Sequence, residues 1–325
     1  MSRTPLIRIA TRGSALALAQ ANLVLAQCRA AFPAQRFELK IIKTTGDKLL
    51  TASLAHPDLP KGLFTKELEV ALLNGEADFA VHSLKDLPTD LPAGLKLGAV
   101  GKRADVRDAL VCRADSVRPP PSGLRVLDGL PQGATVATSS TRRRAQLLDR
   151  RPDLKTVPIR GNVGTRLKKV AGQEDLTATL LAAAGMARLN IKVQPDGQLA
   201  GEGVPQGLWA GLLEPEEMLP CVGQAALGIE VREGNTRIAE ICAALDDRDT
   251  HACVLAERAF LKAMGGGCHL AVAAYADILG SQMRLRAVSF LGGSPRRGDA
   301  KRPVAEASEL GRQLAAELGA PPPAL

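Results

Sequence analysis

Short apolar runs alternate with longer segments of helical character along the first two thirds of the chain. Runs typical of buried strands lie at residues 6–10, 36–44, 78–81, 136–137 and 156–159. Residues 66–73 combine a Lys/Glu surface with an apolar stripe, which predicts a helix. Strands that alternate with helices are typical of α/β domains. We therefore predict α/β structure to about residue 212, with the glycine-rich residues 201–211 as a loop.

The pattern changes near Thr236, where strict alternation ends. The elements predicted beyond it are helices at 238–245 and 251–264, a strand pair at 272–277 and 283–289, and a helix ending at 318. Such an order indicates a small α+β third domain. The charged residues 102–108 lie between two apolar runs, and we expect them to cross between the first two domains.

Four of the predicted strands end in a turn that holds Ser, Thr or Gly beside Arg or Lys. The turns are residues 11–14, 82–86, 138–144 and 160–166. Three of them lead directly into a predicted helix, whose first N–H groups and dipole favour anions. Ordinary helix capping explains one such turn, whereas four in one chain favour anion binding. Ligands of α/β domains bind beyond the carboxyl ends of strands, so we expect the four turns to line one cleft.

Charge and composition narrow the class of anion. The chain has 325 residues and a formal net charge of +8, which favours an acidic partner. Only 2% of the residues are aromatic, which argues against a stacking platform for single-stranded nucleic acid. The sequence also lacks a GxxxxGK[ST] phosphate loop. We therefore expect small organic anions and no nucleic-acid partner.

Cysteine and histidine usage bears on metals and compartment. The six cysteines form no CxxC pair, and the four histidines have no zinc-site spacing, so we expect free thiols and no metal. No apolar run has the length of a membrane span, and the first residues do not resemble a secretory signal. These features predict a cytoplasmic protein without a membrane partner.

Two residues stand out as candidates for chemistry. Asp86 follows Lys85 at the end of a buried run, where it could be a counter-ion, a general acid or a local cap. Cys268 follows three glycines, which permit a close approach to the backbone. It could be a nucleophile with His269 as its base, a covalent anchor for a cofactor, or a buried core thiol.

Several motifs resemble those of a known family, in order along nearly the whole chain. They are residues 8–12 (RIATR), 61–64 (KGLF), 66–69 (KELE), 81–88 (VHSLKDLP), 138–140 (TSS), 142–143 (RR), 160–167 (RGNVGTRL), 222–224 (VGQ), 256–258 (AER) and 266–268 (GGC). By these motifs the chain resembles the porphobilinogen deaminase (hydroxymethylbilane synthase) family. The family's members are monomeric transferases of tetrapyrrole and heme biosynthesis, and a transient contact with the next pathway enzyme is also implied.

The resemblance implies a fold and an activity. It implies two α/β domains like type II periplasmic binding proteins, which flank a cleft, and a small α+β C-terminal domain. The implied boundaries are 1–101 with 217–233, 106–212, and 235–325. The family joins four porphobilinogen molecules head to tail onto a dipyrromethane cofactor, releases ammonia at each step and hydrolyses off hydroxymethylbilane. One dipyrromethane per chain is implied, in thioether linkage to Cys268.

The resemblance also implies roles for single residues. Asp86 would be the catalytic carboxylate, which stabilises an azafulvenium cation and moves protons. The implied cofactor-binding residues, besides Cys268, are Lys85, Ser14, Thr138, Ser139, Ser140, Arg142, Arg143, Arg160 and Arg188. The implied substrate-binding residues are Arg12, Arg166, Ser14 and Gln20. The acetate and propionate of each pyrrole give a physical reason for so many cations.

Some positions depart from the family pattern. Residues 54–62, which resemble the family's lid, contain His56 and two prolines where most relatives have glycines and a further lysine. Thr177 stands where many relatives have an aspartate, and Ala225 stands in place of a glycine. Residues 292–303 form a short, basic segment where relatives often have a longer hairpin. Two other classes stay open: an organic-anion-binding protein, which would need neither Asp86 nor Cys268, and a nucleic-acid binder, which would need only the charge.

Overall fold

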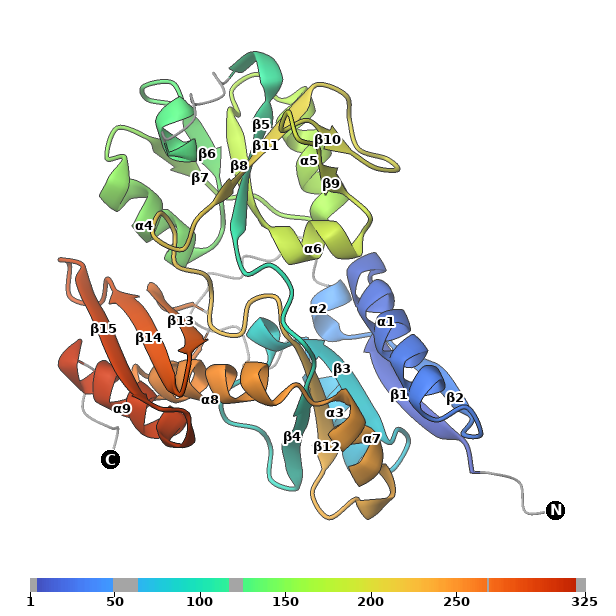
Figure 1. The fold of residues 1–325 in the computed structure, drawn as a ribbon. Helices are drawn as coiled ribbons and strands as arrows, with labels where there is room; N and C mark the ends of the chain where they lie inside the picture. Colours follow the sequence, from blue (N-terminus) through green and yellow to red (C-terminus); the bar gives the residue numbers. More distant parts are fainter. Residues whose placement is uncertain (1–4, 49–63, 117–124, 268, 320–325) are drawn as a thin grey trace.

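The computed structural model describes residues 5–48, 64–116, 125–267 and 269–319. The predicted lid and Cys268 lie outside these residues. The described chain forms two five-stranded sheets and one three-stranded sheet, each covered by helices, and a short two-stranded sheet of β9 (Lys192–Val193) and β10 (Leu199–Ala200) (Figure 1). The predicted fold class, two α/β units and a small α+β unit, is confirmed.

The first sheet is mixed, with the order β2-β1-β3-β12-β4. Its strands are β1 (Ile7–Arg12), β2 (Phe37–Ile42), β3 (Phe79–Ser83), β4 (Leu95–Val100) and β12 (Leu227–Arg232). β1 is parallel to β2 and β3, whereas β12 is antiparallel to β3 and β4. Helices α1 (Ala15–Ala31) and α7 (Ala239–Leu245) pack on one face, and α3 (Lys66–Leu73) packs on the other. The helix predicted at 66–73 is therefore confirmed.

The second sheet repeats this arrangement with the order β11-β5-β8-β6-β7. Its strands are β5 (Asp108–Arg113), β6 (Thr135–Ala137), β7 (Lys155–Val157), β8 (Ala178–Ala182) and β11 (Leu208–Leu213). Its helices are α4 (Thr141–Arg150) on one face, and α5 (Val163–Gly172) and α6 (Ala183–Arg188) on the other. The short elements α2 (Thr45–Lys48), β9 (Lys192–Val193) and β10 (Leu199–Ala200) lie outside the two sheets.

Two crossings of the chain join these units. The first runs from Gly101 to Arg107 and the second from Glu214 to Ala226, and they hydrogen-bond to each other through Ala104 N and Ala225 O (3.3 Å). Ala225 has a φ of 73°, a left-handed conformation that glycine adopts without strain. The alanine at this position therefore places backbone strain in the second crossing. We call the two crossings together, residues 101–107 and 214–226, the hinge.

The third unit packs two helices against an antiparallel sheet, β13-β14-β15. The elements are α8 (Arg248–Ala263), β13 (Val272–Leu279), β14 (Gln282–Ser289), β15 (Arg296–Pro303) and α9 (Ala307–Glu317). The helices approach closely at Gly311, where a Cβ atom would lie 2.3 Å from Ala256 O. Phe260 and Leu314 are fully buried in the core between helices and sheet.

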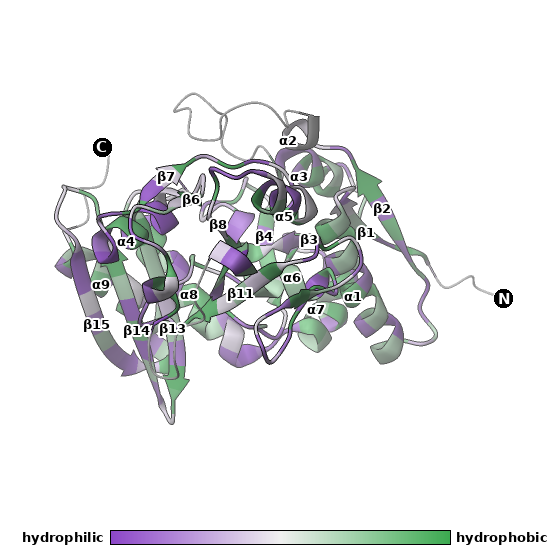
Figure 2. Cartoon of the chain, turned by 90° about the horizontal axis from the view of Figure 1, so that it is seen from above, coloured by the Kyte–Doolittle hydropathy of each residue, from purple (hydrophilic) through white to green (hydrophobic). Residues whose placement is uncertain are grey.

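Two predictions about elements were wrong. The expected loop at 201–211 ends early, because β11 begins at Leu208 and pairs with β5. β15 was not predicted, because its residues are polar on both faces and carry no apolar alternation. β15 is held in strand conformation by its pairing with β14, which the local sequence pattern does not show. Figure 2 shows β15 largely in hydrophilic colours.

Candidate active site

The four basic turns lie where expected, at the carboxyl ends of β1, β3, β6 and β7. Arg12 is the last residue of β1, and Lys85 and Asp86 belong to the 3-10 turn η1 (Leu84–Asp86) that follows β3. Thr138 follows β6, and Arg160 lies shortly after β7. β1 and β3 are parallel neighbours, as are β6 and β7, so each sheet presents two turns at one edge.

Three of the turns provide helix caps. Ser14 Oγ accepts from Ala17 N (3.3 Å) and Ser140 Oγ accepts from Arg143 N (3.4 Å). The Oδ1 of Asn162 accepts from Thr165 N (2.8 Å) at the start of α5. The capping interpretation therefore holds for these oxygens, while the remaining N–H groups of each first turn still favour an anion.

Side chains connect neighbouring turns. The Gln20 amide donates from α1 to Ser83 Oγ (2.8 Å), which joins the first turn to the second. Ser139 Oγ donates to Ile159 O (2.8 Å) and accepts from Ile159 N (3.1 Å), which joins the third turn to the fourth. Within the third turn, Thr138 Oγ1 accepts from Ser140 N (3.2 Å).

Lys85 lies near charged groups of the second unit. It is half-buried, and loss of hydration lowers the pKa of its amine. The nearby guanidinium of Arg143, which comes from α4, lowers this pKa further, while Asp86 opposes the shift. Lys85 of the second turn therefore lies close enough to Arg143 of the third turn to feel its charge, while one cleft shared by all four turns stays a prediction.

Asp86 is exposed beside this half-buried lysine. The segment that follows Asp86 is held from α8, because the Arg258 guanidinium donates to Leu87 O (3.1 Å), Pro88 O (2.6 Å) and Thr89 O (3.4 Å). The backbone directly after Asp86 is therefore anchored to the third unit.

Arg142 and Arg143 hold a fully buried carboxylate, that of Asp108 on β5. Their Nη2 atoms lie 2.7 and 2.8 Å from its two oxygens, and Gln224 Nε2 donates at 2.9 Å. Burial alone would raise the pKa of Asp108, but the two guanidinium groups outweigh it and hold that pKa well below its usual range. The pairing of these two arginines with Asp108 was not predicted from the sequence. Their part in cofactor binding stays a prediction.

Arg166 completes a cluster of cations with Arg143 and Arg160. Burial, followed by the repulsion of these two neighbours, lowers the pKa of Arg166 to about 10. Its Nε donates to Gly161 O (2.9 Å), and among the described residues no carboxylate forms an ion pair with Arg160 or Arg166. Such a cluster attracts anions from outside the chain.

The other predicted arginines lie apart from this cluster. The guanidinium of Arg12 stacks over the Phe64 ring at 4.3 Å from its centroid. Arg188 Nη2 donates to Ala225 O at the hinge (2.5 Å), and burial lowers its pKa to about 10. Thr177 Oγ1 accepts from Thr135 N (3.3 Å) beside β6, so this departure from the family pattern is engaged within the second sheet.

The glycine loop of the third unit reaches this cleft. Gly265, Gly266 and Gly267 have φ values of 106°, 67° and 95°, which residues other than glycine rarely adopt. His269 O accepts from Thr141 Oγ1 (2.7 Å) at the start of α4, and a Cβ on Gly266 would lie 3.3 Å from Thr89 Oγ1. The neighbours of Cys268 in sequence thus lie between η1 and the third turn.

Comparisons with known proteins agree with this geometry. Residues 7–240 match the family model described as "Porphobilinogen deaminase, dipyromethane cofactor binding domain", and residues 251–320 match "Porphobilinogen deaminase, C-terminal domain". The chain belongs to the porphobilinogen deaminase family. It is 44% identical to the porphobilinogen deaminase of Moorella thermoacetica, over 95% of this chain and 93% of that one. It is also 44% identical to that of Paracoccus denitrificans, over 98% and 95%.

A solved structure gives a weaker likeness. Full-length BenM has a TM-score of 0.43 at 17% identity, over 77% of this chain and 67% of that chain.

The described residues fit the cofactor of the porphobilinogen deaminase family. Dipyrromethane carries several carboxylates, and the basic turns offer Arg160 and Arg166, with which no described carboxylate forms an ion pair, together with Lys85. Within the described ranges, no cluster of three His, Cys, Asp or Glu could hold a metal ion, and no helix is long and apolar enough to cross a membrane.

Sequence reasoning missed three residues that organise this site: Asp108, Gln224 and Arg258. Asp108 could have been found, because a carboxylate at the head of an apolar strand becomes buried and then requires cations. Arg258 and Gln224 lie in motifs of the family, but their partners are far away in the sequence.

Proposed function

We propose that the protein is a transferase that joins four porphobilinogen molecules head to tail onto a covalently bound dipyrromethane primer. Each step releases ammonia, and a final hydrolysis yields hydroxymethylbilane. The observation that carries the proposal is the exposed Asp86 carboxylate beside Lys85, at the meeting point of basic turns from two sheets. Membership of the porphobilinogen deaminase family supports the choice of substrate.

The cations of the cleft would hold the acidic side chains of the pyrroles. Every porphobilinogen adds one acetate and one propionate, so negative charge accumulates as the product grows. Arg12, Ser14, Gln20 and Arg166 would bind the incoming substrate. The cofactor would be held by Lys85, Ser14, Thr138, Ser139, Ser140, Arg142, Arg143, Arg160 and Arg188.

Asp86 would carry the proton chemistry. A proton on the aminomethyl nitrogen lets the C–N bond break with its electron pair on nitrogen, so that ammonia leaves. The positive charge left on the porphobilinogen methylene and ring is stabilised by the Asp86 carboxylate. Formation of the new carbon–carbon bond moves this charge to the attacking pyrrole ring, which becomes neutral when its surplus ring proton passes to Asp86. When bound, dipyrromethane supplies the free pyrrole carbon that the first porphobilinogen joins.

The proposal extends to organisation and location. We place the domains at 1–101 with 217–233, 106–212, and 235–325, with Cys268 of the third carrying the cofactor. The protein would act as a cytoplasmic monomer, in transient contact with the enzyme that consumes its product.

Substitution of Asp86 tests the chemistry. Asp86→Asn keeps the shape of the side chain but removes its charge and its proton transfer, so turnover of porphobilinogen should fall by roughly 10²- to 10⁴-fold or more. Asp90→Asn is the matched control, because Asp90 is an exposed carboxylate four residues later that pairs with Lys262. Ammonia release measures turnover, and near-normal turnover by purified Asp86→Asn would refute the assignment.

Intact mass tests the cofactor. The purified protein should exceed its sequence mass by one dipyrromethane, and Cys268→Ser should have the sequence mass and no turnover. An unmodified protein that binds organic acids without turnover would instead be an anion-binding protein. Binding of nucleic acid, in a salt-dependent manner and without turnover, would indicate the third class.

A further inference from the structure

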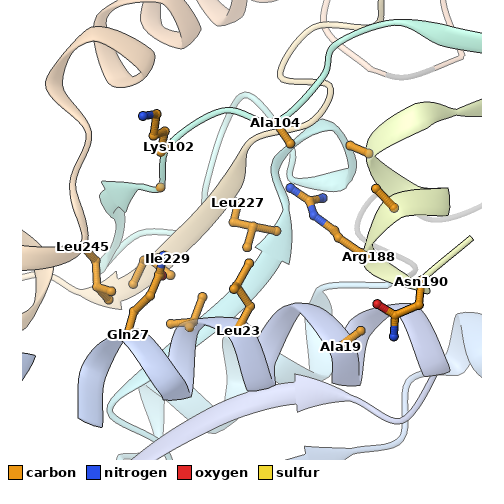
Figure 3. A pocket seen from close by; sticks show the side chains of 14 residues that line it. Ala19, Leu23, Gln27, Lys102, Ala104, Arg188, Asn190, Leu227, Ile229 and Leu245 are labelled. Atoms are coloured by element: carbon orange, nitrogen blue, oxygen red, sulfur yellow. The ribbon is translucent and has the colours of Figure 1, made fainter. Parts of the chain in front are cut away.

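A cavity of about 480 Å³ lies at the hinge, beside the crossings between the two α/β units. Helix α1 and strand β12 of the first unit line one side, and helix α6 of the second unit lines the other (Figure 3). The first crossing contributes Gly101, Lys102 and Ala104. Its volume is within the range of about 300–1,000 Å³ that is usual for small-ligand sites.

The walls of this hinge cavity are largely apolar. Leu23 and Val24 contribute from α1, Leu227 and Ile229 from β12, and Leu245 from the end of α7. Leu23 of α1 is 48% exposed. The exposed leucine side chain gives an apolar ligand a surface that the protein itself does not cover.

One cation enters these apolar surroundings. Arg188 extends from α6 toward Leu227 and Ala104 (Figure 3) and donates to Ala225 O (2.5 Å). Burial lowers the pKa of Arg188 to about 10, and among the described residues no carboxylate forms an ion pair with it. A half-buried guanidinium with one carbonyl acceptor has donors left for an anion. Lys102 adds a second positive charge at the rim.

We propose that the hinge cavity binds a small monocarboxylate with an apolar body. Its carboxylate would pair with Arg188, and its body would lie on Leu23, Leu227 and Ile229. The walls contain no acidic side chain, so their charge and their apolar surface together select an amphipathic anion. Arg188 is the one residue that this cavity shares with the predicted cofactor and substrate sets, and neither Lys85 nor Asp86 lines it.

Occupancy of the cavity would act on the hinge. Because both α/β units line it, a bound molecule favours the arrangement of the units that fits it. Arg188 has a single guanidinium, so a carboxylate in the hinge cavity also competes with any carboxylate that this residue holds in the cleft. The ligand would therefore slow the turnover of porphobilinogen.

Binding of 3-phenylpropionate to the full chain, measured by titration calorimetry, tests the proposal. We expect saturable binding with one site, weakened at least about tenfold in Leu23→Glu, which places a carboxylate in the cavity. Leu255→Glu is the matched control, because Leu255 is a leucine of α8 with a similar exposed fraction, 41%. This control should bind within about twofold of the unchanged chain, and circular dichroism checks that both variants fold.

Three results would overturn the proposal. The first is that 3-phenylpropionate does not bind at a concentration on the order of 10 mM. The second is that Leu23→Glu binds it as tightly as the unchanged chain does. The third is that the unchanged chain binds the neutral 3-phenylpropanamide as tightly as it binds 3-phenylpropionate. Equal binding by Leu23→Glu would place the probe elsewhere, including the cleft around Asp86. None of these results bears on the Asp86→Asn experiment, so failure of this inference leaves the proposed function standing.

Discussion

Asp108 is a carboxylate with no exposed surface that accepts hydrogen bonds from three side chains. Two of them, Arg142 and Arg143, begin the helix of the third basic turn. A buried ion pair of this kind adds little stability when complete, but its rupture leaves an uncompensated charge inside the protein. Asp108 therefore sets where the third turn stands.

Asp108→Asn should lower the free energy of unfolding by about 3–5 kcal/mol, because it leaves both guanidinium groups without an anion. Urea denaturation measures the change. The control is Asp299→Asn, which removes an exposed carboxylate that pairs with Arg284 and should cost at most about 1 kcal/mol. Equal losses in the two variants would contradict the assigned role.

The same residue predicts a pH dependence. The pKa of Asp108 is lower in the folded protein than in the unfolded chain, where it is about 3.9. Its contribution is therefore fully present above about pH 4 and is lost as the pH falls toward the folded-state value. The stability difference between the unchanged protein and Asp108→Asn should be constant from about pH 5 to 7 and should shrink below pH 4. A difference independent of pH down to about pH 2 would contradict this.

Helix α8 is the element that connects the third unit to the segment that follows Asp86. Arg258, near its middle, donates to three successive carbonyls directly after Asp86. Burial lowers the pKa of Arg258, because the charged guanidinium loses hydration there. The helix thereby fixes the backbone on which Asp86 stands.

Arg258→Met should lower kcat for porphobilinogen by about tenfold or more while KM changes by less than about twofold, because Asp86 loses its position but the cationic turns remain. Arg258→Lys, which keeps the charge, should restore part of kcat. Lys262→Met is the control, since Lys262 lies one turn later on α8 and pairs with the exposed Asp90. A change in KM alone would show that Arg258 acts on binding.

Glu257 connects the two crossings to the third unit, and its carboxylate is fully buried. It accepts from Arg103 Nη1 (2.6 Å) and Nη2 (3.0 Å) of the first crossing, and from Gly223 N (2.7 Å) of the second. It also accepts from Ala276 N (2.9 Å) on β13. One side chain therefore holds both crossings against the third unit.

Glu257→Gln should cost about 3–5 kcal/mol, because Arg103 becomes an unpaired buried charge. The third unit should then unfold in a separate transition at lower temperature, visible by scanning calorimetry. Glu240→Gln, an exposed glutamate on α7, should leave a single transition. One unchanged transition in Glu257→Gln would show that other contacts join the units.

Local pattern was sufficient for much of the fold and part of the site. The helix at 66–73 has the predicted bounds, and the basic turns follow the predicted strands, because apolar periodicity and turn residues act within a few positions. β15 was missed because its order comes from pairing with β14 and not from its own residues. Residues 208–211 were misjudged as loop because buried pairing with β5 outweighs the loop character of glycine in β11, whereas residues 201–207 lie outside the strands as predicted.

The sequence by itself determined the α/β alternation, the four cationic turns and the motifs of the porphobilinogen deaminase family, since these depend on neighbours along the chain. Only the tertiary structure decided which charges meet. Arg142 and Asp108 are 34 residues apart, and Arg103 and Glu257 are 154 apart. Burial turns such distant pairs into strong constraints because it removes the water that would otherwise satisfy each charge. The hinge cavity and its partly unpartnered Arg188 arise in the same way, from two units packed side by side.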